Sequence, residues 1–156
     1  DFMDDPMFHR RRVVRLPDDV YVIEDRVTGI CREEHDIRLY YNFAFGHLDG
    51  ENGKFDYTSQ KGRRYTMTVQ ADKKLDFEIL EGSEDPIGGW ISYGYAWRKP
   101  IPQLIAKHSG KAPIHFITVL APEGTKAETA INGDAATVTL AGGKVLTLTE
   151  NAVELH

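Results

Sequence analysis

The feature that most constrains the fold of this chain is the alternation of apolar and polar residues with a period of two. It is clearest in residues 36–45, DIRLYYNFAF, and recurs at 63–70 and 75–81. In the first of these segments, the apolar residues of one parity are Ile37, Leu39, Tyr41, Phe43 and Phe45. Successive side chains of a strand point to opposite faces, so this pattern predicts strands buried on one face. No segment has a sustained 3.6-residue apolar stripe, and at most one helical turn is expected, at 101–108.

The positions of turn residues predict how these strands connect. Segments 8–16 and 19–27 flank a Pro-Asp-Asp turn and are expected to form a hairpin. Residues 113–121, PIHFITVLA, are apolar on both faces, which is typical of a central strand. Further short strands are expected at 136–140, 144–149 and 152–155. About nine to ten or more strands in antiparallel order predict an all-β fold, an antiparallel β-sandwich.

Composition excludes several classes of protein. The 19 Lys and Arg residues against 24 Asp and Glu give a net charge of -5, which argues against a nucleic-acid binder that works by bulk electrostatics. No apolar run approaches the roughly 18 residues of a membrane span. The single cysteine, Cys31, excludes an internal disulfide and is expected to be a buried or idle thiol. Without repeats or low-complexity segments, residues 1–156 are expected to form a single domain.

No motif in the sequence indicates catalysis, a metal or a cofactor. The six histidines have no HxH or HExxH spacing, and His115, inside the central strand, is expected to be a hydrogen-bonded core residue. Neither a nucleotide-binding glycine pattern nor GxSxG is present. Asp25 is expected to form a structural ion pair or to cap a turn, and the basic run at 9–12 to lie on a solvated edge strand. The remaining acidic clusters, at 33–34 and 81–85, are expected to be solvated turn residues.

The window 90–102, WISYGYAWRKPIP, is the candidate ligand-binding segment. If it is extended, Tyr93, Tyr95 and Trp97 project from one face, with small residues on the other. Aromatic faces beside cations such as Arg98 and Lys99 stack sugar rings and hold their acidic groups. The alternative is that two of the three rings fill a core. The sequence leaves both open, within a region, 82–112, that is expected to be the least regular of the chain.

The order of several short motifs resembles the C-terminal β-domain of heparinase II/III-like polysaccharide lyases. The motifs are HRRRVVRL, VYVIEDRVTG, EEHDIRLYYNFAFG, SYGY followed by Lys-Pro, and FITVLAPEG, within residues 9–124. Members of that family join an N-terminal helical toroid to an antiparallel β-sandwich and cleave uronic-acid polysaccharides by β-elimination. The resemblance therefore implies that residues 1–156 are the C-terminal part of a longer protein, periplasmic or secreted, that acts on a glycosaminoglycan or alginate.

The same resemblance implies that this chain supplies no catalytic residue. The family's catalytic tyrosine and the group that neutralises the substrate carboxylate come from the toroid. A further histidine and the metal-binding residues come from a Gly-His-x-His-x-Asp-like segment that the sequence lacks. His9 and His35 lie in other contexts and do not replace it. The chain is thus expected to be a non-catalytic β-sandwich that helps to form the cleft for an acidic polysaccharide, with the toroid as its missing partner.

Two other functions fit the sequence. A stand-alone carbohydrate-binding module would use Tyr93, Tyr95 and Trp97, with Arg98, as its platform. A structural or interaction domain would instead bury these rings and dock a helical partner on an exposed apolar face.

Overall fold

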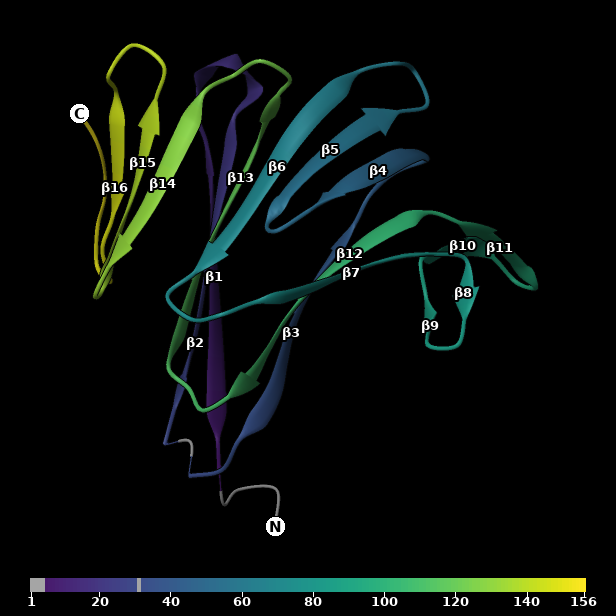
Figure 1. Ribbon diagram of the computed structural model, residues 1–156, viewed down its shortest axis with the longest axis horizontal. Coiled ribbons are helices and arrows are strands. Elements are labelled where there is room, and N and C mark those ends of the chain that lie inside the picture. Colours follow the sequence, from purple (N-terminus) through teal and green to yellow (C-terminus); the bar gives the residue numbers. More distant parts are fainter. Residues whose placement is uncertain (1–4, 31) are drawn as a thin grey trace.

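The computed structural model describes residues 5–30 and 32–156 and is almost entirely β-structure. Its central layer is a six-stranded antiparallel sheet in the order β1-β2-β13-β6-β5-β4 (Figure 1). The bounds of these strands are β1 Met7–Arg15, β2 Tyr21–Gly29, β4 Gly46–Glu51, β5 Lys54–Ser59, β6 Arg64–Ala71 and β13 Ile114–Pro122. The predicted hairpin of the first two strands is confirmed, since β1 and β2 pair from Met7 with Gly29 to Arg15 with Tyr21. Its turn is a single 3-10 turn, Pro17–Asp19.

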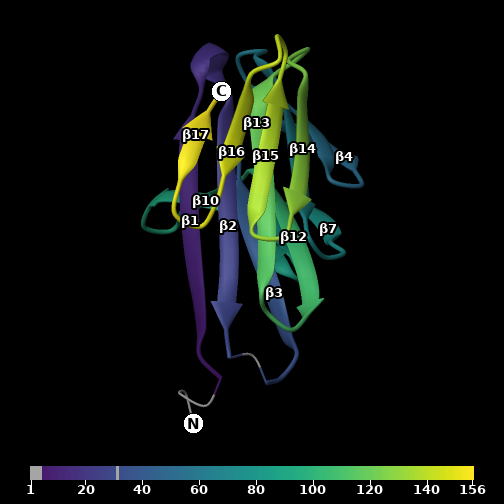
Figure 2. The ribbon, with the colours of Figure 1, turned by 90° about the vertical axis from the view of Figure 1, so that its left-hand side faces the viewer.

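Two smaller sheets cover the two faces of the central sheet (Figures 1 and 2). One has the order β3-β12-β7, with β3 His35–Asn42, β7 Asp76–Glu81 and β12 Pro102–Gly110. The other runs β14-β15-β16-β17, with β14 Ala127–Asn132, β15 Ala135–Leu140, β16 Val145–Leu148 and β17 Val153–Leu155. The all-β antiparallel prediction is therefore confirmed, and the sandwich has a third layer.

The central strand β13 shows how one sheet serves two cores. Phe116 is fully buried against the β3-β12-β7 sheet, whereas its neighbour Ile117 is fully buried against the β14–β17 sheet. Side chains of a strand alternate between faces, so a strand covered on both sides must be apolar at both parities. This explains the continuous apolar run at 113–121, and the prediction of a central strand there is confirmed.

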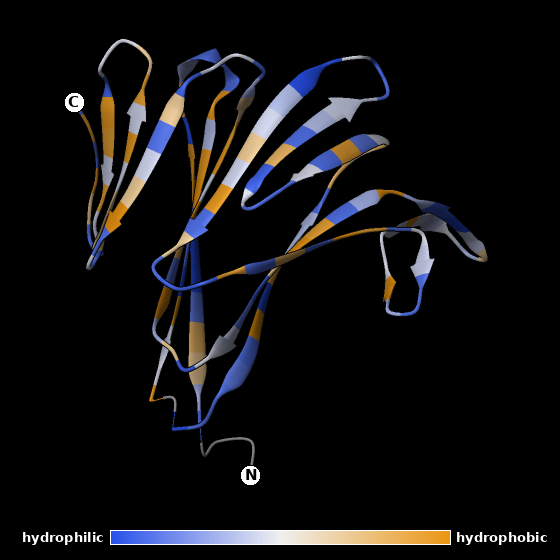
Figure 3. Ribbon diagram, in the orientation of Figure 1, coloured by the Kyte–Doolittle hydropathy of each residue, from blue (hydrophilic) through white to orange (hydrophobic). Residues whose placement is uncertain are grey.

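The alternations predicted at 36–45 and 63–70 also hold, whereas in 75–81 the most buried residue is Leu80, of the opposite parity to Leu75, Phe77 and Ile79. Ile37, Leu39 and Tyr41 of β3 are buried between exposed neighbours, and Met67 and Val69 of β6 are buried in the same core. Figure 3 shows the change between hydrophobic and hydrophilic residues along the strands. The expectation of a helical turn at 101–108 is wrong, because this segment is β12, the middle strand of its sheet. Leu104 and Ala106 are completely buried there. Region 82–112 is accordingly more regular than expected. Cys31 lies outside the described residues.

Candidate functional site

The aromatic window forms a hairpin that projects from one end of the molecule (Figure 1). Its strands are β10 Trp90–Gly94 and β11 Trp97–Pro100, and they follow a smaller hairpin of β8 Ser83–Glu84 and β9 Ile87–Gly88. Trp90 anchors the two hairpins to each other, since its Nε1 donates a hydrogen bond of 2.9 Å to the carbonyl of Ser83. Beyond Ile91, every residue up to Pro100 is exposed.

The window 90–102 does not run as one extended segment. Gly94 pairs with Trp97, so Tyr95 and Ala96 form a two-residue loop that reverses the chain. Ala96 has a φ of 55°, in the left-handed region that such tight loops require and that non-glycine residues seldom adopt. The Ser92 hydroxyl lies 2.9 Å from the carbonyl oxygen of Gly94 and 2.6 Å from that of Trp97, which supports the reversal.

None of the three candidate aromatic rings, Tyr93, Tyr95 and Trp97, fills a core. Tyr95, at the tip of the loop, is 103% exposed, Tyr93 is 72% exposed and Trp97 is 37% exposed. The Tyr93 and Trp97 rings contact each other, with centroids 5.3 Å apart and planes inclined by 38°. The hairpin thus brings these two rings together on the surface, with Tyr95 beyond them. They meet because the chain reverses between them, and not because they share one face of a single strand.

The cations beside the rings have different partners. Arg98 forms a 2.6 Å ion pair with Glu84 and lies over the Trp90 ring, 4.2 Å from its centroid. Lys99 lies over the Trp97 ring at 5.4 Å, and within the described part of the chain it has no carboxylate partner. A ligand carboxylate or sulfate would therefore meet Lys99 uncompensated, whereas Arg98 would first have to share its charge with Glu84.

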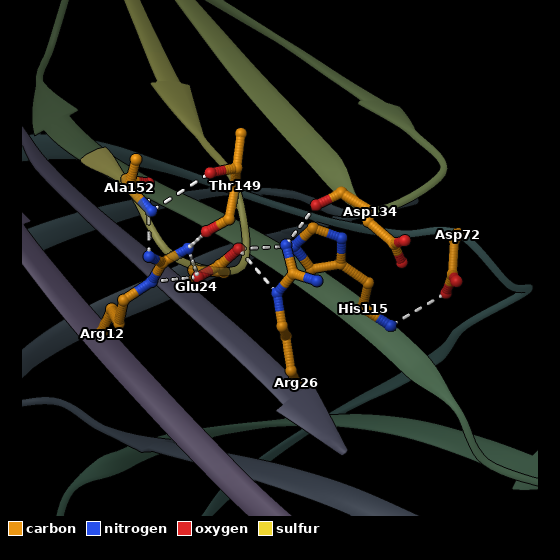
Figure 4. Close-up of polar contacts among 8 residues, drawn as sticks. All are labelled: Arg12, Glu24, Arg26, Asp72, His115, Asp134, Thr149 and Ala152. Atoms are coloured by element: carbon orange, nitrogen blue, oxygen red, sulfur yellow. Dashed lines mark hydrogen bonds and ion pairs between the residues drawn. The ribbon is translucent and has the colours of Figure 1, made fainter. Parts of the chain in front are cut away.

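Sequence reasoning missed a second cluster, a buried charge network around Glu24 (Figure 4). The Glu24 side chain is 1% exposed and accepts hydrogen bonds from Arg12 at 2.5 Å and Arg26 at 3.0 Å. Nε2 of His115 lies 2.9 Å from the same carboxylate. Arg12 also donates to the carbonyls of Thr149 and Ala152, and Arg26 to that of Asp134.

These contacts give Glu24 a structural task. The three carbonyl acceptors lie in turns of the β14–β17 sheet, whereas Glu24 and both arginines belong to the central sheet. Burial by itself raises the pKa of Glu24, but the hydrogen bonds from His115, Arg12 and Arg26 outweigh it and lower the pKa from 4.5 to about 2. The carboxylate thus stays charged and orients two arginines that hold the outer sheet.

The next residue, Asp25, has a matching arrangement on the opposite face. Its carboxylate is fully buried and receives two hydrogen bonds from Arg11, at 2.7 and 3.1 Å, with His9 Nε2 at 2.6 Å. The hydrogen bonds to Asp25 raise the pKa of Arg11. The predicted ion pair is confirmed. Edge strand β1 is as basic as expected, but Arg11 and Arg12 pair with buried carboxylates instead of being fully solvated.

The other polar candidates lie apart from one another in the structure. His115 is buried, as expected, but it is only partly hydrogen-bonded, because its Nδ1 has no partner among the described residues. His35 lies 2.7 Å from Asp5, and the hydrogen bond from His35 is the main reason that the pKa of Asp5 falls to about 2. Among the described residues, no three His, Cys, Asp or Glu side chains are arranged to hold a metal ion. No helix in this part of the chain is long and apolar enough to cross a membrane.

Comparison with known proteins shows which solved structures have a similar fold. No family model matches the sequence, and no curated protein matches it. Among solved structures, a heparinase III gene product superposes with a TM-score of 0.70 at 17% identity, over 92% of this chain and 24% of its own. The heparan sulfate lyase HepC from Pedobacter heparinus superposes with a TM-score of 0.68 at 14% identity, over 96% of this chain and 25% of its own. A third structure, heparinase III, superposes with a TM-score of 0.68 at 17% identity.

These superpositions establish the fold. The chain has the architecture of a β-sandwich portion of heparinase III structures, as the motif resemblance predicts. It spans about a quarter of the length of those proteins.

Proposed function

We propose that this chain is the β-sandwich domain of a heparinase II/III-like lyase and forms one side of the cleft that holds a uronic-acid polysaccharide. The observation that carries the proposal is the superposition of 92% of the chain on 24% of a heparinase III gene product. β-Elimination would be performed by residues outside residues 1–156. The parent protein would be periplasmic or secreted, where its polymer is found.

The β10–β11 hairpin is the part of the domain best suited to contact the polymer. Sugar rings stack their C–H faces on aromatic rings, and Tyr93 and Trp97 lie together on the surface. Lys99 and Arg98 supply positive charge for a uronate or sulfate group. In this role the hairpin positions substrate and takes no part in proton transfer.

The whole parent protein provides the test. Recovering the coding sequence upstream of Asp1, expressing the full chain and following the absorbance of unsaturated uronate should reveal cleavage of heparan sulfate, another glycosaminoglycan or alginate. Residues 1–156 alone should leave that absorbance flat. In the full chain, Tyr95→Ala should raise KM several-fold with little change in kcat, because it removes binding far from the reacting bond. Absence of cleavage of every acidic polymer by the full protein would refute the proposal.

A stand-alone carbohydrate-binding module is the second candidate, and the complete exposure of Tyr95 favours it. It differs from the first in whether binding depends on the rest of the parent protein. A module binds acidic oligosaccharides as tightly by itself as within the parent protein, whereas one side of a cleft binds them more weakly alone. Affinity electrophoresis of residues 1–156 in gels with and without heparan sulfate measures this directly, and unchanged mobility excludes the module.

A further inference from the structure

A pocket of about 450 Å³ lies at the end of the β5–β6 hairpin, outside the segment discussed so far. It is lined by Ala44, Phe45, Tyr57, Ser59, Gln60, Lys61, Arg63 and Tyr65. Three of the eight are aromatic, two are cations and none is acidic. In a chain whose net charge is -5, a pocket with this lining is suited to a negatively charged ligand that has an apolar face.

The aromatic wall of this pocket is fixed by packing. The Tyr57 ring is 7% exposed, stacks on Tyr65 with centroids 6.5 Å apart, and contacts the tilted ring of Phe43 at 4.9 Å. The Tyr57 hydroxyl is within hydrogen-bonding distance of the carbonyls of Ala44, 3.1 Å, and Phe45, 3.3 Å. Burial raises the pKa of Tyr57, so this hydroxyl stays a donor at neutral pH. The half-buried Tyr65 ring is the part of this stack that a ligand can reach.

The cationic rim is held by the turn between β5 and β6. Ser59 and Arg63 are linked twice, since Ser59 N donates to the Arg63 carbonyl at 2.8 Å and Arg63 N donates to Ser59 Oγ at 3.0 Å. Gln60 N donates to the Phe45 carbonyl at 2.9 Å, which ties the turn to the opposite wall. The backbone that carries Lys61 and Arg63 is therefore ordered before a ligand arrives.

Nearby carboxylates do not neutralise this rim. Asp56 of β5 accepts a hydrogen bond from Thr66 at 2.8 Å, and Glu123 pairs with Arg64 at 3.1 Å. In the described part of the chain, neither Lys61 nor Arg63 has a carboxylate partner. The ordered turn thus presents two cations without carboxylate partners beside an aromatic wall. The charge of this pocket is complementary to that of an anionic ligand.

We infer that this pocket is a second contact for the acidic polysaccharide, in which one sugar ring stacks on Tyr65 while Lys61 and Arg63 bind its carboxylate or sulfate. The substrate class rests on the proposed function. The β5–β6 turn and the β10–β11 hairpin both lie on the right-hand side of Figure 1, with the turn above the hairpin, so a polymer of several sugar units is the ligand that suits two separate contacts there.

Isothermal titration of residues 1–156 with a heparan sulfate hexasaccharide tests the inference. The double variant Lys61→Ala/Arg63→Ala should weaken binding roughly tenfold or more, because two charge-assisted hydrogen bonds are lost. The matched control is Lys126→Ala/Lys144→Ala, which removes the same charge from exposed positions near the β14–β17 sheet and should change binding less than twofold. Tyr65→Ala should weaken binding several-fold, and Tyr65→Phe, which keeps the ring, should not.

Each other outcome counts against the pocket. Equal binding by both double variants, or no binding of the hexasaccharide by the unaltered chain, would overturn the inference, while the proposed function would still stand on cleavage by the full parent protein. Equally tight binding of ATP or of inorganic polyphosphate, with the same dependence on Lys61 and Arg63, would show a general anion site and reject the sugar assignment. Circular dichroism confirms that each variant is folded.

Discussion

The network around Glu24 and the β10–β11 hairpin both depart from the usual placement of side chains, in which charged groups are exposed and large apolar groups are buried. At Glu24 charged groups are buried, and at the hairpin large aromatic groups are exposed. The buried carboxylate is paired with two arginines that extend to the outer sheet, so the integrity of the fold explains it. The exposed rings contact each other and nearby cations but cover no core, so stability does not explain them. Burial with partners is explained by the fold, and exposure without cover is the feature on which the proposed ligand contact rests.

Removing the carboxylate of Glu24 should have the largest effect on stability. Glu24→Ala leaves Arg12 and Arg26 without their shared partner in a buried site, which is expected to cost about 3–5 kcal/mol of unfolding free energy. Urea unfolding monitored by circular dichroism measures this loss. The control is Glu128→Ala on the exposed side of β14, which should change stability by no more than about 0.5 kcal/mol. A loss below about 1 kcal/mol for Glu24→Ala would mean that the network does not hold the layers together.

Acid should weaken the same network in a defined pH window. The pKa of Glu24 is about 2 in the folded chain and 4.5 as an ordinary side chain. Its contribution to the unfolding free energy is therefore fully present above about pH 4.5 and is lost as the pH falls towards 2. The contribution is of the order of 3 kcal/mol. Unfolding free energies measured from pH 6 to pH 2 should fall more steeply for the unaltered chain than for Glu24→Gln, which has no charge to lose. Parallel curves for the two proteins would contradict the assignment.

A neutral contact on the other face of the central sheet should have a smaller effect. The hydroxyl of Tyr41 in β3 lies 2.7 Å from that of Thr118 in β13, and both residues are buried. Burial raises the pKa of Tyr41 to about 12, so the hydroxyl remains protonated at neutral pH. Thr118→Val strands that hydroxyl and should cost about 1–3 kcal/mol. If Tyr41→Phe/Thr118→Val is no more stable than Thr118→Val alone, the hydrogen bond is not the source of the loss.

The sequence allowed most of the strands to be predicted, because their alternation records which face is buried. The third layer was not predicted, although the run at 113–121, apolar at both parities, is typical of a strand covered on both faces. In the structure, Glu24 and Asp25 show the same thing, since neighbouring side chains of a strand can both be buried only if both faces are covered. Such a pair is ambiguous in sequence, because two adjacent acidic residues are more often solvated.

Two segments have a conformation that the sequence did not reveal, for different physical reasons. In 101–108, Leu104, Ile105 and Ala106 form a short apolar run that does not distinguish a helix from a buried strand. The segment is a strand because it pairs with β3 and β7. In 90–102, the chain reverses at Tyr95 and Ala96 without the Asn-Gly or Asp-Gly signal that marks most two-residue loops. The Glu24 network could not be assembled from sequence, because Arg12 and His115 come from other strands and only the fold brings them to Glu24.

The hairpin should respond to mutation in the opposite way from Glu24, with almost no change in stability. Tyr95→Ala removes a side chain at a fully exposed loop tip, so the unfolding free energy should stay within about 0.5 kcal/mol of the unaltered chain. Retention on immobilised heparan sulfate should nevertheless fall, because a stacking surface is lost. Tyr40→Ala, at a half-exposed position in β3, is the control for retention and should leave it unchanged. If Tyr95→Ala destabilises the chain by more than 1 kcal/mol with retention unaltered, the hairpin is structural, and the contrast between the two regions disappears.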